Sequence, residues 1–214
     1  MKKGIFISFE GPEGGGKSTH IRDLERFLEN NGIKTLRTRE PGGTRLGEVV
    51  RDLLQNNLAG EAPSSRAEVM LFAASRAQLC ENVIRPALDE GTWVLADRYA
   101  DSTYAYQGYA RGFNLADLKE ITRFATGSLV PDLTILLDLP PEASRQRLAA
   151  RANAPDRIES EGEEFHLKVR NGFLELARDN PERYAVIDAR DSREAVSALI
   201  EAEIKARFPN QVRS

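Results

Sequence analysis

The segment from Gly11 to Ser18 reads Gly-Pro-Glu-Gly-Gly-Gly-Lys-Ser and carries the residue types that bind phosphate. Its glycines allow the backbone to bend closely around phosphate oxygens, so that successive N–H groups point at negative charge. Lys17 adds a mobile cation for the β- and γ-phosphates, and Ser18 offers a hydroxyl to Mg²⁺, which prefers oxygen ligands. The spacing matches the G-x-x-x-x-G-K-[ST] phosphate loop, or P-loop. The residues expected to bind ATP are Gly11, Pro12, Glu13, Gly14, Gly15, Gly16, Lys17, Ser18 and Thr19.

A P-loop needs a strand before it and a helix after it, and the sequence predicts both. Residues 4–10 are short, β-branched and aromatic, which is typical of a buried strand. After the loop, apolar side chains recur at helical spacing at Ile21, Leu24, Phe27 and Leu28. The motif therefore lies in the structural context that it requires.

The rest of the chain alternates between predicted strands and predicted helices. The further strands cover residues 35–39, 92–96, 133–137 and 184–188. The further helices cover residues 66–90, 115–125, 141–152 and 193–208. This alternation is typical of a parallel sheet. We therefore predict one α/β domain over residues 1–214, with a five-stranded parallel sheet covered by helices on both faces.

Charged residues stand at or just after the carboxyl ends of these strands, where such sheets bind ligands. They are Arg39, Asp97, Arg98 and Asp138, and we expect them around one cleft with the P-loop. Asp97 has the chemistry to orient Mg²⁺ or its water shell, so Ser18 and Asp97 form the expected metal site, although Asp97 could instead cap a turn. The planar, permanently charged fork of Arg98 suits a monophosphate, and its alternative is a surface ion pair.

Composition narrows the class of partner. A net charge of -3 over 214 residues leaves no overall basic footprint for nucleic acid, so small nucleotides are the expected partners. No apolar run approaches membrane length and no charged-then-apolar leader is present, so neither a membrane partner nor export is expected. Cys80 is the one cysteine and cannot form an internal disulfide, which indicates a packed thiol in a cytoplasmic protein.

Three segments supply chemistry for a phosphate acceptor: residues 37–44, 71–76 and 97–107. Together with the P-loop, and in order over nearly the whole chain, they resemble the thymidylate kinases. The resemblance implies transfer of the γ-phosphate of ATP to dTMP, giving dTDP and ADP, with Mg²⁺ and in a cytosolic homodimer. The residue pattern alone indicates a nucleotide-dependent phosphotransferase.

Phe72 and Arg76 are four residues apart on a predicted helix and so share one face. The ring can stack on a base while the guanidinium donates to the carbonyl edge of that base, although core packing is the alternative for Phe72. In the family, matching residues hold thymine in this way. Arg39 is expected to reach the acceptor phosphate, with Arg37 and Arg45 as alternatives. The resemblance implies further substrate-binding roles for Glu13 at the sugar, and for Thr103, Tyr106 and Gln107 in the acceptor pocket.

Arginines gather around residues 150–161, the segment that we expect to form a short lid. With Glu13 in the P-loop and a glycine directly after it, the chain resembles those thymidylate kinases that place their catalytic arginines in such a lid. Phosphoryl transfer spreads negative charge over the migrating group, so a closing arginine can lower the barrier. Arg145 or Arg147 could instead belong to a solvated helix face. The expected catalytic residues are Lys17, Arg98, Arg157 as the first choice in the lid and Arg151 as the second.

Three functions remain open at this point. A kinase for dTMP is favoured by the P-loop together with the acceptor motifs. A kinase for another pyrimidine nucleotide or a nucleoside is an alternative, because one methyl group separates thymine from uracil and contributes only about 1–3 kcal/mol in a pocket. A regulatory P-loop ATPase is a third, which the arginines around the second cleft disfavour.

The homodimer is inferred chiefly from the resemblance. The helix predicted over residues 66–90 is apolar over more than one stripe, through Leu79, Cys80 and Ile84. Such a helix suits packing against a partner helix as well as against the sheet, or it can be a buried central helix.

Overall fold

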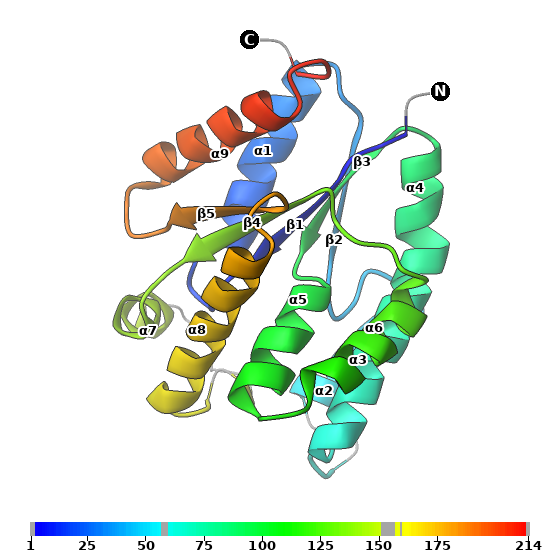
Figure 1. The fold of residues 1–214 in the computed structure, drawn as a ribbon, viewed down its shortest axis with the longest axis vertical. Coiled ribbons are helices and arrows are strands. Elements are labelled where there is room, and N and C mark those ends of the chain that lie inside the picture. Colours follow the sequence, from blue (N-terminus) through cyan, green and yellow to red (C-terminus); the bar gives the residue numbers. More distant parts are fainter. Residues whose placement is uncertain (1–2, 57–59, 151–156, 159, 213–214) are drawn as a thin grey trace.

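The computed structural model describes residues 3–56, 60–150, 157–158 and 160–212. Within these residues the chain forms one parallel sheet with helices on both sides (Figure 1). The five strands lie in the order β2-β3-β1-β4-β5. They are β1 (Phe6–Glu10), β2 (Thr35–Arg39), β3 (Trp93–Asp97), β4 (Leu133–Asp138) and β5 (Tyr184–Asp188). The predicted α/β class and the five-stranded parallel sheet are confirmed.

The helices occupy the connections between strands and the C-terminal part of the chain. The α-helices are α1 (Lys17–Asn30), α2 (Arg45–Gln55), α3 (Ser65–Leu79), α4 (Arg85–Asp89), α5 (Ala100–Thr103), α6 (Leu115–Thr126), α7 (Pro141–Ala149), α8 (Glu163–Asp179) and α9 (Arg193–Arg207). Two π-helical segments continue α-helices, η1 (Cys80–Ile84) after α3 and η2 (Tyr104–Ala110) after α5. No helix within the described ranges is long and apolar enough to cross a membrane.

Alternate residues of the central strand β1 point to opposite faces of the sheet, as strand geometry requires. Ile7 and Phe9 pack with residues of α1 and α9. Phe6 packs on the other face with η1 and α4. A further cluster joins α8 and η2 to β4 through Tyr106 and Phe173. Figure 1 shows α1 and α9 together on one side of the sheet, with α4, α5 and α8 on the other.

The strand order places a topological switch point at the end of β1. Its neighbours β3 and β4 belong to connections that leave in opposite directions, and ligands bind at such a point. The register pairs Phe9 with Asp97 and Asp97 with Arg39, so the carboxyl ends of β1, β3 and β2 are level. These ends deliver the P-loop and two of the predicted charged residues to one edge of the sheet.

The segment predicted as one helix over residues 66–90 is continuous through α3, η1 and α4. Leu79, Cys80 and Ile84 are fully buried in the core beside β1 and β3, so these residues support the interpretation as a buried central helix. Cys80 is a packed free thiol, and burial raises its pKa to about 11.

Sequence reasoning missed three helical regions and lengthened a fourth. It did not predict α2, the α5 and η2 segment, or α8. The apolar positions Val169, Phe173 and Leu176 on α8 do follow helical spacing, but charged residues between them masked the pattern. The helix predicted over residues 141–152 ends at Ala149 as α7, and residues 151–156 lie outside the described residues.

Candidate active site

The P-loop joins β1 to α1 and surrounds the first turn of that helix. Gly11, Gly14 and Gly16 have positive φ, and a Cβ at Gly11 would lie 2.4 Å from the carbonyl oxygen of Leu137. A side chain at this position would therefore collide with the backbone of β4. Helix α1 begins at Lys17, within the loop, and the N–H groups at a helix N-terminus favour an anion.

Lys17 lies buried in the loop. Its Nζ donates to the carbonyl oxygens of Gly11, at 3.2 Å, and Pro12, at 2.9 Å, and lies 4.0 Å from the carboxylate of Glu13. Burial lowers the pKa of Lys17, and the positive charge of Arg98 acts in the same direction. An incoming phosphate would add negative charge beside this ammonium and so favour its charged form.

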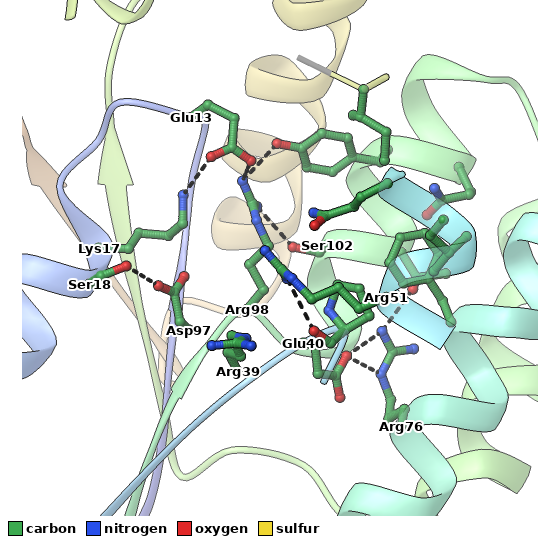
Figure 2. Close-up of a pocket in the computed structure, with 18 of the residues that line it drawn as sticks. Glu13, Lys17, Ser18, Arg39, Glu40, Arg51, Arg76, Asp97, Arg98 and Ser102 are labelled. Atoms are coloured by element: carbon green, nitrogen blue, oxygen red, sulfur yellow. Dashed lines mark hydrogen bonds and ion pairs between the residues drawn. The ribbon is translucent and has the colours of Figure 1, made fainter. Parts of the chain in front are cut away.

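Ser18 and Asp97 meet across the loop. The Ser18 hydroxyl donates to Oδ2 of Asp97 at 2.5 Å, and Figure 2 shows the two side chains facing each other close to Lys17. A hydroxyl beside a carboxylate is a hard oxygen donor set that fits Mg²⁺, which takes few protein ligands and completes its shell with water and phosphate oxygens. In keeping with that mode, the described residues contain no group of three or more His, Cys, Asp and Glu side chains arranged to hold a metal.

Arg98 lies at the centre of the site. Its Nη2 donates to the carboxylate of Glu13 and to the hydroxyl of Tyr106, the latter at 3.0 Å, while Nη1 donates to Ser102 Oγ at 3.1 Å. The guanidinium also lies over the Tyr106 ring, 5.0 Å from its centroid. Figure 2 shows Arg98 reaching toward Glu13 and Lys17 of the P-loop. Arg98, from the connection between β3 and α5, thus brings a second positive charge to the P-loop beside that of Lys17.

Arg76 enters the site from the opposite side, on α3. Its Nε donates to Glu40 Oε2 at 2.7 Å and its Nη2 to Thr103 Oγ1 at 3.0 Å. Burial by itself would lower the pKa of Arg76, but the charge of Glu40 outweighs burial and raises it. Phe72 lies one turn earlier on the same helix and lines the same cavity. The predicted base-binding pair is therefore together, with Arg76 anchored by a buried carboxylate.

A cavity of about 410 Å³ joins these groups. The predicted residues that line it are Glu13, Gly14, Gly16, Lys17, Ser18, Thr19, Arg39, Phe72, Arg76, Asp97, Arg98, Thr103, Tyr106 and Gln107. The other predicted P-loop residues do not line the cavity: they are Gly11, Pro12 and Gly15. Further lining residues that were not among the predicted site residues are Glu40, Pro41, Arg51, Leu54, Gln55, Ser102 and Ile158. Four of these seven lie on or next to α2 and α5, helices that sequence reasoning missed, and helical spacing from Val50 to Leu54 was the available signal for α2.

Arg157, the first choice for a lid arginine, contacts α3. Its guanidinium pairs with the buried carboxylate of Glu68, which also accepts from Gln107 Nε2 at 2.8 Å. Burial opposes ionisation of Glu68, yet the hydrogen bonds from Arg157 and Gln107 lower its pKa. The neighbour Ile158 lines the cavity. Arg151, the second choice, lies outside the described residues, as does much of the expected lid.

Other charged residues considered from the sequence have different partners. Arg37 pairs with Glu25, whereas Arg39 pairs with Glu48 at 2.7 Å and lines the cavity. Asp138, expected near the cleft, accepts two hydrogen bonds from Arg170 on α8.

The two basic residues of α7 differ. Arg145 forms an exposed pair with Glu163. Arg147 donates to the carbonyl oxygens of Gly14, at 3.2 Å, and Ala189, at 2.7 Å, and so ties the P-loop to the segment after β5. The interpretation as a solvated face therefore fits Arg145 and not Arg147.

A P-loop at the switch point of a parallel sheet, sharing one cavity with an arginine-lined second pocket, defines the fold and site of a P-loop nucleoside monophosphate kinase. Comparison with known proteins narrows this class. The sequence model of the thymidylate kinase family matches residues 9–200, and the chain belongs to that family.

Individual relatives agree with this assignment. A protein named thymidylate kinase from Carboxydothermus hydrogenoformans is 50% identical over 194 residues, which cover 91% of this chain and 93% of the relative. Another of that name from Deinococcus radiodurans is 47% identical over 207 residues, 97% of this chain and 99% of the relative. The crystal structure of thymidylate kinase from Ehrlichia chaffeensis superposes with a TM-score of 0.74 at 31% identity, covering 95% of this chain and 98% of that one.

Proposed function

We propose that this chain transfers the γ-phosphate of ATP to dTMP, giving dTDP and ADP. The observation that carries the proposal is the single cavity in which a P-loop faces the Phe72 and Arg76 pair, in a chain that matches the thymidylate kinase family over residues 9–200. A regulatory ATPase has no use for a second pocket that is joined to the nucleotide loop. A kinase would use the P-loop side of the cavity for ATP and the side lined by Phe72 and Arg76 for the phosphate acceptor.

In the donor half, the P-loop backbone and Lys17 bind the phosphates of ATP. Ser18 and Asp97 would hold Mg²⁺, which neutralises charge on the β- and γ-phosphates when bound. The ammonium group of Lys17, held in the loop by the carbonyl oxygens of Gly11 and Pro12, stabilises the negative charge that develops during transfer.

In the acceptor half, Arg98 and Arg39 hold the monophosphate of dTMP. Phe72 stacks on thymine, and Arg76, fixed by Glu40, faces the carbonyl edge of the base. Binding energy at the base and phosphate thus fixes the acceptor oxygen for attack on the γ-phosphate.

The remaining acceptor residues complete the pocket. Glu13 and Tyr106 contact the sugar side, where an aromatic ring near C2′ favours deoxyribose. Thr103 and Gln107 add polar contacts. Arg157, with Arg151 as the second choice, leaves its resting position to stabilise the transition state. We expect the ion pair between Arg157 and Glu68 to break during that movement.

The test is a measurement of ADP release and dTDP formation with Mg-ATP and a panel of acceptors: dTMP, dUMP, UMP, CMP, thymidine and none. We expect dTMP to give the highest kcat/KM, with a low rate in the absence of an acceptor. Arg98→Ala should lower turnover with dTMP while leaving ATP binding intact. Equal rates with and without acceptor would contradict the proposal in favour of an ATPase, and preference for another acceptor would reassign the substrate.

We also propose that two copies form a homodimer in the cytoplasm. Large apolar side chains are exposed on three neighbouring helices, α2, α3 and α6: they are Leu46, Val49, Met70 and Phe124, the last with 87% of its surface exposed. Helix α3 packs against both α2 and α6, and exposed apolar side chains gathered on adjoining helices favour protein association. Light scattering at several concentrations should give twice the chain mass, and Phe124→Asp should shift it toward the monomer. A monomeric mass for the unaltered chain at all concentrations would contradict the dimer.

A further inference from the structure

Arg98 adopts a backbone conformation that side-chain-bearing residues avoid. Its φ is 71°, in the left-handed region where Cβ crowds the backbone. The residue stands between the end of β3 and the start of α5, with its side chain directed into the cavity (Figure 2). Strained conformations of this kind persist where neighbouring groups hold them, and they concentrate at functional sites.

The end of β1 provides the groups that hold this conformation. The backbone N–H of Arg98 donates to the carbonyl oxygen of Phe9 at 3.0 Å. The next N–H, of Tyr99, donates to Oε1 of Glu10 at 2.8 Å. The two N–H groups on either side of the strained torsions are therefore tied to consecutive residues of the central strand.

The other oxygen of Glu10 acts on the side chain. Ser102 Oγ donates to Oε2 of Glu10 at 2.6 Å, and Nη1 of Arg98 donates to the same Ser102 Oγ at 3.1 Å. One carboxyl group thus fixes the backbone next to Arg98 directly and its guanidinium through a single hydroxyl. The remaining guanidinium contacts, with Glu13 and Tyr106, lie on the P-loop and η2.

A second carboxylate near Glu10, that of Asp101, has a basic partner of its own. Asp101 accepts from Nη1 and Nη2 of Arg183, at 2.6 and 3.1 Å. Glu10 is completely buried, at 0% exposure. Ser102 thus links the buried carboxyl group of Glu10 to the cavity that Ser102 lines.

We propose that Glu10 is a positioning residue for the acceptor phosphate, acting through Tyr99 and Ser102 to aim Arg98 into the cavity. The inference rests on the proposed function, in which Arg98 binds that phosphate. A role confined to stability would lower the free energy of unfolding and leave the ratio of dTMP affinity to thymidine affinity unchanged. A positioning role weakens ligands that carry the phosphate and spares those that lack it.

The experiment compares dTMP with thymidine, which has the same base and sugar but no phosphate, by calorimetry on Ser102→Ala, Glu10→Ala and Glu10→Gln. Ser102→Ala removes the hydrogen bond between Ser102 and the charged guanidinium of Arg98, so it should lower the affinity for dTMP by about tenfold. Glu10→Ala should lower the affinity by more. Thymidine affinity and the KM for ATP should stay within about twofold of the unaltered chain. Glu10→Gln, which keeps an acceptor for Tyr99 and a partner for Ser102, should recover most of the dTMP affinity.

Asp132→Asn is the matched control, because Asp132 accepts the backbone N–H of Phe6 at 2.8 Å at the opposite end of the same strand. It should alter thermal stability without changing the ratio of dTMP to thymidine affinity. Equal losses for both ligands in Ser102→Ala, unchanged dTMP affinity in Ser102→Ala, or a Glu10→Gln variant that binds dTMP no better than Glu10→Ala would each overturn the proposal.

Two further measurements separate this inference from the proposed function. If Arg98→Ala keeps full affinity for dTMP, the acceptor assignment is wrong. The crystal structure of Ser102→Ala without ligand tests the geometry by itself: we expect the Arg98 guanidinium to leave its observed position. An unmoved guanidinium would refute positioning through Ser102 whatever the substrate is.

Discussion

Arg76 carries a full charge into the interior, with its side chain 2% exposed, and it remains there because Glu40 provides the opposite charge. The same ion pair holds the guanidinium beside Thr103. It therefore contributes to stability and also fixes the position of Arg76 in the proposed base-binding part of the cavity. At the residue scale, the site is therefore a set of charges that are paired before any ligand arrives.

Glu40→Gln should destabilise the chain by about 3–5 kcal/mol, because it leaves the buried charge of Arg76 uncompensated. Urea unfolding measures the change. Glu120→Gln is the control: it breaks an exposed pair with Arg123, at 2.9 Å, and should cost less than about 1 kcal/mol. Similar costs for the two variants would contradict the importance assigned to burial.

Glu10 predicts the direction of a pH dependence of stability. Burial, reinforced by the charge of Asp101 and opposed by Arg98, Ser102 and the N–H of Tyr99, raises its pKa from 4.5 to about 8. Between these values the folded chain holds a proton that the unfolded chain has released, so this group makes the free energy of unfolding fall as pH rises. Glu10→Gln cannot ionise and should flatten the decline between about pH 5 and 8, measured by urea unfolding at several pH values. An unchanged slope in this variant would assign the dependence elsewhere.

At the element scale, close packing of α8 on η2 shapes the acceptor side of the cavity. Phe173 of α8 packs edge-on against Tyr106, with ring centroids 6.1 Å apart, and Tyr106 is the residue whose hydroxyl meets Arg98. Gly172 allows this approach, since a Cβ there would lie 2.7 Å from Tyr109 Cγ. The packing of α8 on η2 therefore affects the site through the ring of Tyr106.

Gly172→Ala should destabilise the chain by about 1–3 kcal/mol, because the added methyl collides with the Tyr109 ring base and forces the two helices apart. Thermal unfolding gives the stability, and the KM for dTMP should rise as Tyr106 shifts. Asn171→Ala, on the exposed face of the same helix, is the control and should be neutral or slightly stabilising. A stabilised Gly172→Ala would show that the gap between α8 and η2 tolerates a methyl group.

At the scale of the whole molecule, the two halves of the cavity come from segments far apart in the chain and meet only in the folded state. The donor half follows β1, and the acceptor half draws on α2, α3, α5 and η2. Each ligand therefore binds the folded chain and not the unfolded one, so each should raise stability by mass action.

Saturation with dTMP at one hundred times its dissociation constant should raise the free energy of unfolding by about 2.7 kcal/mol. Thermal shift assays should show this gain with and without EDTA. The gain from ATP should fall when EDTA removes Mg²⁺, and Asp97→Asn should abolish that dependence on EDTA. A dTMP effect that also requires the metal would contradict the division of the cavity into a metal-dependent donor half and a metal-independent acceptor half.

The sequence by itself determined the P-loop, the alternation of strands and helices, and the placement of Asp97 and Arg98 at a strand end. These features are local: the loop residues are contiguous, and strand ends follow from composition over a few positions. Phe72 and Arg76 could be paired in advance because helical spacing places them on one face.

The tertiary structure alone decided which distant charged and polar side chains meet. Arg76 with Glu40, Arg157 with Glu68, and Glu10 with Ser102 are separated by 36, 89 and 92 positions, and no periodicity in the chain relates them. Their pairing follows from the strand order and from how closely α2, α3, α5 and α8 pack, which in turn depends on the shapes of buried side chains from all parts of the chain. Short-range patterns specify the elements, whereas only the closed core brings their distant charges within hydrogen-bonding distance.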